Sequence, residues 1–305
     1  MHVNTEQLKI GIAGWSYTDW HDTVYRLPPA QQQVDLFGDP IREPAQYARD
    51  ELVFIKDFVD MIEINSSFYR IPSPKATASW VRRVSDKPHF FFTAKLNNAF
   101  THDQRRDPTL AKAFVSAMRP LAEAGRLRGL LAQFRYDFSD TPAAREVLSW
   151  IRSQFSPLAP LIVEVRHVSW QTAEALGFLQ DLPATVAHLD YPTARDSFTP
   201  RLCTSGQTAY LRLHGRNRKA WFSRKATVEE TYNYDYSTEE VKGLAERSEE
   251  ILGKVKELTI VANNHYQGKA VSAALRIKSE LTKEKLAIPP ALVDTYPHLI
   301  RILKQ

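Results

Sequence analysis

The chain has 305 residues, 43% of them hydrophobic and 11% aromatic, which is ample for a buried core. Its net charge is +5, but the 40 basic residues are spread along the chain and do not form the clustered stripe of a dedicated nucleic-acid binder. There is no apolar run near the roughly 20 residues of a membrane span, no secretory signal pattern and only one cysteine, Cys203, so we expect a cytoplasmic protein without a membrane partner or a disulfide framework.

Eight short runs rich in β-branched and aromatic residues predict strands, and helical patterns separate them. The predicted strands lie at about 8–13, 59–64, 89–96, 129–134, 161–165, 184–189, 208–214 and 257–263. Alternating strands and helices favour parallel pairing through right-handed crossovers. We therefore predict an α/β fold, a single (β/α)8 TIM barrel over residues 1–305, with its core at about 8–282 and a C-terminal extension at 283–305.

Three helix starts are marked by capping residues. Ser73-Pro74 and Thr141-Pro142 each place a proline in the first helical turn, and Ser237 with Glu240 fits a capping box. The last of these predicts a long helix over 238–256, whose apolar residues recur every three or four positions on one face.

The loops after the first and seventh predicted strands are longer than the others. Residues 15–46 contain Trp15, Trp20 and a glutamine tract at 31–33, and residues 215–236 interleave basic and aromatic side chains. Both loops follow the C-terminal end of a strand, so both should overhang the same mouth of the barrel.

Most of the predicted strands end on two polar residues spaced two apart. Side chains in a strand alternate between faces, so such residues point the same way, while interleaved residues such as Ile62, Val163 and Leu211 point the other. We expect the polar face to line the C-terminal mouth, where the active sites of this fold lie. The pairs are Glu63 and Asn65, Lys95 and Asn97, Gln133 and Arg135, Glu164 and Arg166, His188 and Asp190, and Arg212 and His214.

Seven segments, in order, resemble the DUF72 or YecE-like family of uncharacterised TIM-barrel proteins: GIAGWSYTDW, MIEINSSFYRIP, FFFTAKLNNAFTH, LLAQFRYDF, IVEVRHVSW, YLRLHGR and VANNHYQGKA. The resemblance extends from about Ile10 to Ile277. It implies a (β/α)8 fold and a shared mouth, but no known reaction. The matching positions are Glu63, Asn65, Tyr69, Lys95, His102, Gln133, Glu164, Arg166, Trp170, Asp190, Arg212, His214, Gly215 and Asn264.

This chain departs from the family pattern at two places. It has Arg135 where members usually have proline after Gln-Phe, and Ala262 where they often have phenylalanine before Asn-Asn. The first change adds a cation near the mouth and the second removes an aromatic ring. Substrate preference is therefore expected to differ within the family.

The charges expected at the mouth are nearly balanced. Glu63, Glu164 and Asp190 face Lys95, Arg166 and Arg212, and His214 can join either side. Because buried charges persist when they are paired, one interpretation is a purely structural ion network. A functional interpretation is favoured because such a network costs free energy that an apolar layer would not, and because titratable clusters concentrate at functional sites.

The favoured hypothesis is an enzyme, of hydrolase, lyase or nuclease-like type, that acts on a phosphorylated or nucleotide-containing anionic substrate. Guanidinium groups would bind the anion, carboxylates would act as general base, His214 would act as general acid, and aromatic faces would hold a base or sugar ring. The predicted catalytic residues are Glu63, Lys95, Glu164, Asp190 and His214, and the predicted substrate-binding residues are Trp15, Asn65, Tyr69, His102, Gln133, Arg166, Trp170, Arg212, Asn263 and Asn264.

Two other hypotheses remain open at this point. Glu164, Asp190 and His214, with Asn263 or Asn264, could hold a divalent metal in an isomerase or endonuclease-like enzyme. Alternatively, the loop from Arg216 to Trp221 could make the protein a non-catalytic module that binds nucleic acid or a partner protein. The sequence has neither GxxxxGK nor GxGxxG after a strand, which argues against P-loop and Rossmann nucleotide cofactors and leaves the cofactor unidentified.

Overall fold

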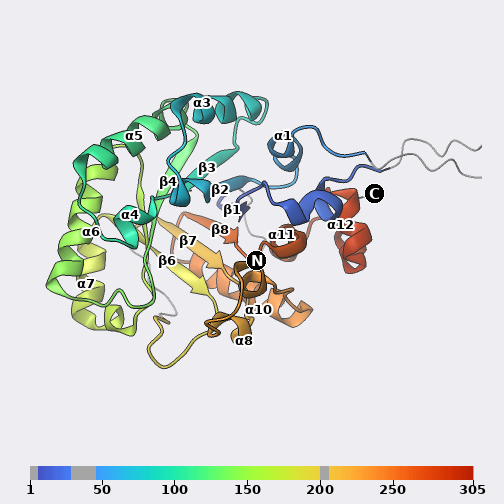
Figure 1. Ribbon diagram of the computed structural model, residues 1–305. Helices are drawn as coiled ribbons and strands as arrows, with labels where there is room; N and C mark the ends of the chain where they lie inside the picture. Colours follow the sequence, from blue (N-terminus) through green and yellow to red (C-terminus); the bar gives the residue numbers. More distant parts are fainter. Residues whose placement is uncertain (1–5, 29–45, 200–205, 305) are drawn as a thin grey trace, which may run out of the picture.

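The computed structural model describes residues 6–28, 46–199 and 206–304 (Figure 1). Its strands pair in parallel and in chain order, and β1 pairs with both β2 and β8, which closes the barrel. This confirms the predicted (β/α)8 fold. The strands are β1 (Leu8–Ala13), β2 (Met61–Ile64), β3 (Phe91–Lys95), β4 (Leu127–Gln133), β5 (Leu161–Glu164), β6 (Ala184–Asp190), β7 (Thr208–Leu213) and β8 (Glu257–Ala262).

Helices surround the barrel, and the chain also contains short 3-10 and π turns (Figure 1). The helices are α1 (Glu51–Ile55), α2 (Ser66–Tyr69), α3 (Pro74–Arg83), α4 (Asn98–Thr101), α5 (Pro108–Glu123), α6 (Pro142–Phe155), α7 (Ala173–Asp181), α8 (Arg218–Trp221), α9 (Val228–Tyr232), α10 (Thr238–Leu252), α11 (Lys269–Thr282) and α12 (Pro290–Thr295). The turns are η1 (Thr18–Trp20), η2 (His21–Tyr25), η3 (Val168–Gln171), η4 (Tyr266–Gly268) and η5 (Pro297–Ile302). Among the residues described, no helix combines the length and the apolar character that a membrane crossing requires.

The three predicted helix starts are confirmed. The Ser73 hydroxyl accepts a hydrogen bond from the amide of Ala76, and Ser237 forms the expected capping box with Glu240. Thr141 caps α6 in the same way as Ser73 caps α3. Helix α10 ends at Leu252, short of the predicted 256, because Gly253 is a weak helix former and the chain must turn into β8 at Glu257.

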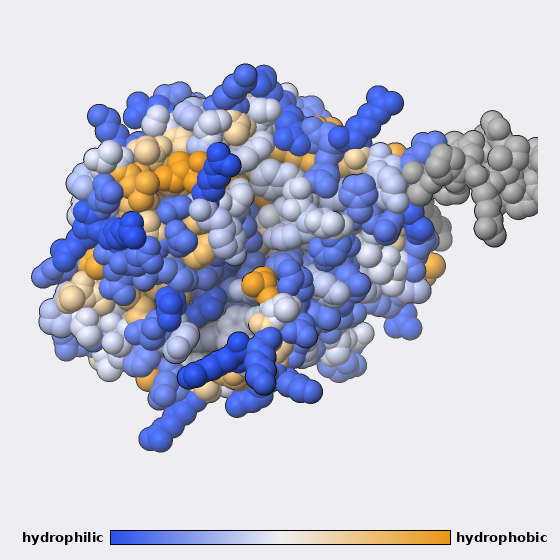
Figure 2. Space-filling model, in the orientation of Figure 1, coloured by the Kyte–Doolittle hydropathy of each residue, from blue (hydrophilic) through white to orange (hydrophobic). Residues whose placement is uncertain are grey.

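A hollow lies beyond the ends of β6 and β7, between α4 and α8, on a face that is mostly hydrophilic (Figure 2). It is the mouth at the C-terminal end of the barrel. The predicted long loops after β1 and β7 both border it, through Trp15 to Tyr17 and through α8 and α9. The glutamine tract at 31–33 and Cys203 lie outside the described residues.

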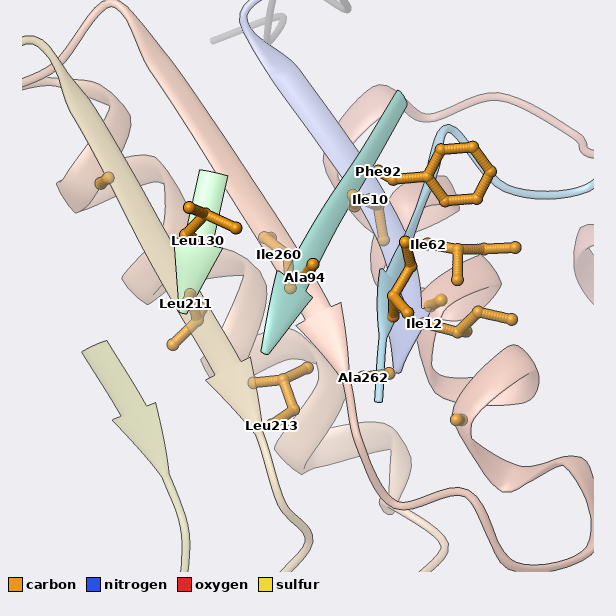
Figure 3. Packing of buried hydrophobic residues seen from close by; sticks show 14 of the residues in the cluster. Ile10, Ile12, Ile62, Phe92, Ala94, Leu130, Leu211, Leu213, Ile260 and Ala262 are labelled. Carbon is orange, nitrogen blue, oxygen red and sulfur yellow. The ribbon is translucent and has the colours of Figure 1, made fainter. Parts of the chain in front are cut away.

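Two apolar layers support this mouth. The larger lies between the strands and the helices and contains Ile62, Val163 and Leu211, as the alternation predicts. Figure 3 shows part of this layer, with Ile62 and Leu211 among the labelled residues. A smaller one fills the inside of the barrel and includes Met61, Leu131 and their neighbours. The polar residues at the C-terminal ends of the strands therefore stand on an apolar plug, away from water below them.

The C-terminal segment is part of this packing. Leu292 of α12 and Leu299 of η5 are fully buried, and Leu286 pairs with Leu303 through an isolated parallel bridge. Helix α12 packs against η2 in the loop after β1. Residues 283–304 thus add to the outer layer, where η5 packs against α11 and α12 packs against the loop after β1.

Candidate functional site

The centre of the mouth is the guanidinium of Arg212, which is fully buried. Its Nη2 donates to Glu63 Oε1 at 2.6 Å and its Nε donates to Glu63 Oε2 at 3.1 Å. Its Nη1 donates to Glu164 Oε2 and, at 2.9 Å, to Gln133 Oε1. Burial alone would lower the pKa of Arg212, but the two carboxylates outweigh it and raise the pKa above the usual value.

These contacts correct the predicted role of Arg212 in substrate binding. Four of its five N–H groups are occupied by Glu63, Glu164 and Gln133, and none of its surface is exposed. Gln133 is likewise turned toward Arg212. Both side chains form the floor of the mouth, and the carboxylates of Glu63 and Glu164 are held there as the counterions of Arg212.

The second carboxylate, Glu164, also contacts Arg166 and His214. Arg166 donates from Nε at 2.9 Å and from Nη2 at 2.6 Å to Glu164 Oε1, and His214 Nε2 lies 3.3 Å from the same oxygen. Burial would raise the pKa of Glu164, but Arg212 and Arg166 hold the pKa well below its ordinary value. Glu164 is therefore ionised at neutral pH and is a weak base.

The neutral imidazole of His214 corrects the prediction that it acts as a general acid. Burial lowers the pKa of His214 to about 3 despite the nearby charge of Glu164. The amide Nδ2 of Asn263 lies 3.0 Å from His214 Nδ1. His214 therefore carries no extra proton to donate at neutral pH.

Lys95, at the end of β3, differs from every other charged residue of the cluster. It is buried, its Nζ lies 4.3 Å from the centroid of the Phe68 ring, and it makes no ion pair or hydrogen bond through Nζ to any residue that the structure describes. Burial, and then the positive charge of Arg212, lower the pKa of Lys95 to about 7. Lys95 thus exists in both protonation states near neutral pH.

The loop after β7, residues 215–236, covers the floor of the mouth with aromatic side chains. The ring centroids of Trp221 and Tyr232 lie 5.7 and 6.3 Å from that of His214. The guanidinium carbon of Arg166 lies 5.3 Å from the centroid of the Trp221 ring. The loop contributes residues to two cavities, and Tyr232 borders both.

The smaller of these cavities, about 370 Å³, lies over β1, β2, β3 and β8. Five predicted residues line it, namely Trp15, Asn65, Tyr69, Lys95 and Asn263. The larger, about 760 Å³, is lined by Arg166 and by several aromatic rings, among them Tyr136, Tyr191, Trp221 and Phe222. Six of the predicted site residues therefore line one or the other of the two cavities.

His102, on the loop after β3, lies beside this space without lining it. Its ring is edge-on to Phe68 at 4.7 Å, and burial together with the charge of Lys95 lowers the pKa of His102 to about 4. It is neutral at pH 7 and supports the Phe68 ring on which Lys95 rests.

The prediction that His188 and Asp190 point into the barrel is wrong. In β6 the inward residues are Ala187 and Leu189, which belong to the apolar plug, and the register places Leu189 beside Arg212 and Asp190 beside Leu213. Neighbouring residues in register share a face, so Asp190 points outward toward the helices. There it accepts hydrogen bonds from Arg216 at 2.7 Å and from the Tyr236 hydroxyl at 2.7 Å.

The outward direction of Asp190 also separates it from the proposed metal triad. Glu164 and His214 lie together, but their third partner is on the other side of the sheet. Within residues 6–28, 46–199 and 206–304 no three His, Cys, Asp or Glu side chains are placed to hold a metal ion. The predicted catalytic role of Asp190 is corrected to a structural contact with the loop 215–236.

Two more predicted substrate-binding residues lie away from the cavities. Trp170, in η3 after β5, is fully buried, stacks on Phe138 and donates from Nε1 to the Phe138 carbonyl at 2.8 Å. Asn264 is buried and donates from Nδ2 to the carbonyl of Tyr234 at 2.9 Å. Trp20, another candidate ring, is also buried and donates to the carbonyl of His265 at 2.6 Å.

Other residues of the mouth did not emerge from the sequence. Tyr210 donates to Glu63 Oε2 at 2.9 Å. It lies two residues before Arg212 in the same strand, so the alternation of faces could have predicted that it points inward. Tyr17 and His265 stack at 4.5 Å beside the smaller cavity, and Tyr232 reaches it from the loop 215–236. Tyr17 and His265 lie in loops and Tyr232 is the last residue of the short helix α9, so the alternation of faces within a strand does not predict their directions.

Comparisons with known proteins agree on one family. The family model described as "Protein of unknown function DUF72" matches residues 9–295. The UPF0759 protein YunF of Bacillus subtilis is 22% identical over 302 residues, which cover 94% of this chain and 99% of that protein.

Two crystal structures of DUF72 family proteins are similar throughout. One from Thermotoga maritima has a TM-score of 0.72 and 28% identity, covering 90% of this chain and 99% of its own. One from Enterococcus faecalis has a TM-score of 0.75 and 22% identity, covering 92% and 98%. The family model matches nearly the whole length of the chain, and the structure is a closed eight-stranded barrel. The chain therefore belongs to the DUF72 family.

Proposed function

We propose that the mouth is the active site of an enzyme that performs acid/base chemistry, of hydrolase or lyase type, on a phosphorylated or nucleotide-containing anion. The observation that carries the proposal is that Lys95 has no ion-pair partner in the part of the chain that the structure describes. Glu63 and Glu164 balance Arg212 and Arg166, so the charge of Lys95 has no counterion among the described residues. A buried cation without a partner is costly, and a bound anion would compensate it.

Lys95 is also the group best suited to exchange a proton. A general acid or base works best when its pKa is near the working pH, and the pKa of Lys95 is about 7. Glu63 and Glu164 are held by Arg212, and His214 stays neutral. We therefore assign the proton transfer to Lys95 and a positioning role to the network below it.

Arg166 supports the same proposal from the larger cavity. Its Nη1 makes no hydrogen bond to any described residue, while Nε and Nη2 are held by Glu164, so the guanidinium is oriented with one edge open. The rings of Tyr191, Trp221 and Tyr232 border this space. Flat aromatic faces beside a guanidinium suit the base of a nucleotide, with its phosphate toward Lys95.

Sulfate binding measured by titration calorimetry at about pH 8 tests the proposal, because sulfate does not itself titrate there. An anion beside Lys95 should raise its pKa, so binding should take up close to one proton, seen as a dependence of the binding heat on the ionisation heat of the buffer. Lys95→Arg should bind sulfate without proton uptake, and Lys95→Met should bind at least 10-fold more weakly.

Equal sulfate affinity of wild type and Lys95→Met would refute the proposal. Binding that needs Lys95 but takes up no proton would instead favour a module that binds anions without catalysis. Circular dichroism of the two variants checks that each is folded. A thermal-shift screen of nucleotides and phosphorylated metabolites with the same three proteins would then narrow the substrate.

A further inference from the structure

We infer that Lys95 is a nucleophile that condenses with an aldehyde or ketone, so that the substrate of the mouth is a small anion carrying a carbonyl group. The inference rests on the proposed function in that the carbonyl compound is expected to enter as an anion. It goes further by assigning a covalent intermediate to one named nitrogen.

The first support is the position of the amine. Lys95 lines the 370 Å³ cavity, and nothing in the described parts of the chain hydrogen-bonds to its Nζ. Phe68 covers one side of it at 4.3 Å. A nitrogen that is neither ion-paired nor hydrogen-bonded, and that borders a cavity large enough for a small molecule, can approach a carbonyl carbon directly.

The second support is the fixed charge beside it. Lysine is activated as a nucleophile when it is desolvated and placed next to another cation. The positive charge of Arg212 acts on Lys95 and lowers its pKa. The two carboxylate partners of Arg212 hold it in place through hydrogen bonds from Nε, Nη1 and Nη2. Glu63 and Glu164 raise the pKa of Lys95 in part, but less than burial and Arg212 together lower it. Both carboxylates are hydrogen-bonded to Arg212, and among the described residues neither forms an ion pair with Lys95.

A comparison within the chain shows that burial alone does not create this arrangement. Lys56 is as buried as Lys95, but its Nζ is paired with Asp86 and donates to the carbonyl of Arg83 at 3.1 Å. Its nitrogen lone pair is therefore not available. Lys56 serves as a matched internal control in the same polypeptide.

The reaction balances without any other reagent. The neutral amine attacks the carbonyl carbon, a C–N bond forms and the π electron pair moves to oxygen. The C–O bond then breaks and water leaves, giving a protonated imine. Counted from the ammonium form, two hydrogens of Lys95 leave in the water and the charge of +1 is unchanged. The iminium withdraws electrons from the adjacent carbon, which favours cleavage of a neighbouring C–C or C–H bond.

Borohydride trapping tests the inference. The protein is incubated with glyoxylate, a small anionic aldehyde, at about pH 7 in the presence of sodium cyanoborohydride, which reduces an imine to a stable secondary amine. Peptide mass spectrometry then gives the extent of modification at every lysine. We expect Lys95 to be modified at least 10-fold faster than Lys56, and sulfate to slow only the modification of Lys95.

The modification rates of Lys95 and Lys56 are then compared with formaldehyde, which is smaller than glyoxylate and carries no charge. We expect Lys95 to remain the fastest lysine, and Lys95→Arg to show no adduct at that position. Modification of Lys95 no faster than that of Lys56 with both probes would overturn the inference. If sulfate binding with proton uptake persists in that case, the proposed acid/base function stands and only the covalent step is wrong.

Discussion

The buried charge of Lys95 lowers the stability of the folded protein in a way that depends on pH. In the unfolded chain its pKa is ordinary, and in the folded protein burial lowers the pKa to about 7. Between these two values the unfolded state binds more protons, so stability rises with pH across that interval. The full loss of stability from burying Lys95 is present below about pH 7. It disappears once the pH exceeds the pKa that Lys95 has in the unfolded chain.

Lys95→Met removes this penalty and should therefore be more stable than wild type near pH 7. The advantage should shrink by roughly 1–3 kcal/mol between about pH 7 and about pH 9.5, because proton binding to Lys95 in the unfolded wild type favours unfolding less as the pH rises. Urea unfolding of both proteins at several pH values measures it. Lys87, an exposed lysine paired with Asp57, has a raised pKa, so Lys87→Met should differ from wild type by a constant amount over this range.

A stability difference between Lys95→Met and wild type that does not change with pH would show that Lys95 is not desolvated. That result would also remove the reason for its reactivity as a base.

At the scale of elements, the loop 215–236 is anchored from outside the barrel. Asp190 at the end of β6 pairs with Arg216, which also reaches Glu240 at the start of α10 at 3.1 Å. Gly215 has a φ of +82°, and a Cβ there would lie 2.6 Å from that of Tyr234, so only glycine fits this turn. The loop that covers the mouth is thus fastened to β6 and α10 on the helix side of the sheet.

Asp190→Asn keeps the shape of the side chain but removes its charge. We expect a loss of about 1–3 kcal/mol in unfolding free energy, because the hydrogen bonds from Arg216 and Tyr236 lose their charged acceptor. Limited proteolysis should cut residues 215–236 faster than in wild type.

Asp137→Asn is the matched control for Asp190→Asn, because its partner Arg135 lies in an exposed pair that contributes little to stability. If Asp190→Asn left stability and proteolysis unchanged but abolished binding of a divalent metal, the outward assignment of Asp190 would be wrong.

At the scale of the whole molecule, Arg212 joins parts of the barrel that are far apart in the chain. Its partners lie on β2, β4 and β5, 149, 79 and 48 residues away from it. Arg212→Met leaves the buried carboxylates of Glu63 and Glu164 without their shared counterion. We expect the unfolding free energy to fall by about 3–5 kcal/mol.

Chemical denaturation measures this loss, and Arg135→Met, which removes an exposed arginine, should change stability by less than about 1 kcal/mol. A triple variant that replaces Glu63, Glu164 and Arg212 by apolar residues should recover much of the loss. Failure of the triple variant to recover any stability would mean that hydrogen bonds other than those of the ion network hold the floor together.

Several features could be predicted because they depend on neighbours along the chain. The strands follow from short apolar runs, and the starts of α3, α6 and α10 follow from capping residues only three positions from the amides that they bind. The inward direction of Glu63, Lys95 and Glu164 follows from the alternation of faces within one strand. The seven segments that resemble the DUF72 family predicted the fold and the position of the mouth.

What the sequence alone determined was therefore the strands, the helices, the closed barrel and most of the residues that face its mouth, because these depend on local periodicity and on segments of adjacent residues. Only the tertiary structure decided which face Asp190 takes, since the polar and small residues of β6 fit either direction and the register with β7 selects one. Only the tertiary structure decided that Arg212 binds both carboxylates and that Lys95 has no ion-pair partner within residues 6–28, 46–199 and 206–304. Charge pairing across a closed barrel depends on side chains that meet in space and not on their spacing along the chain.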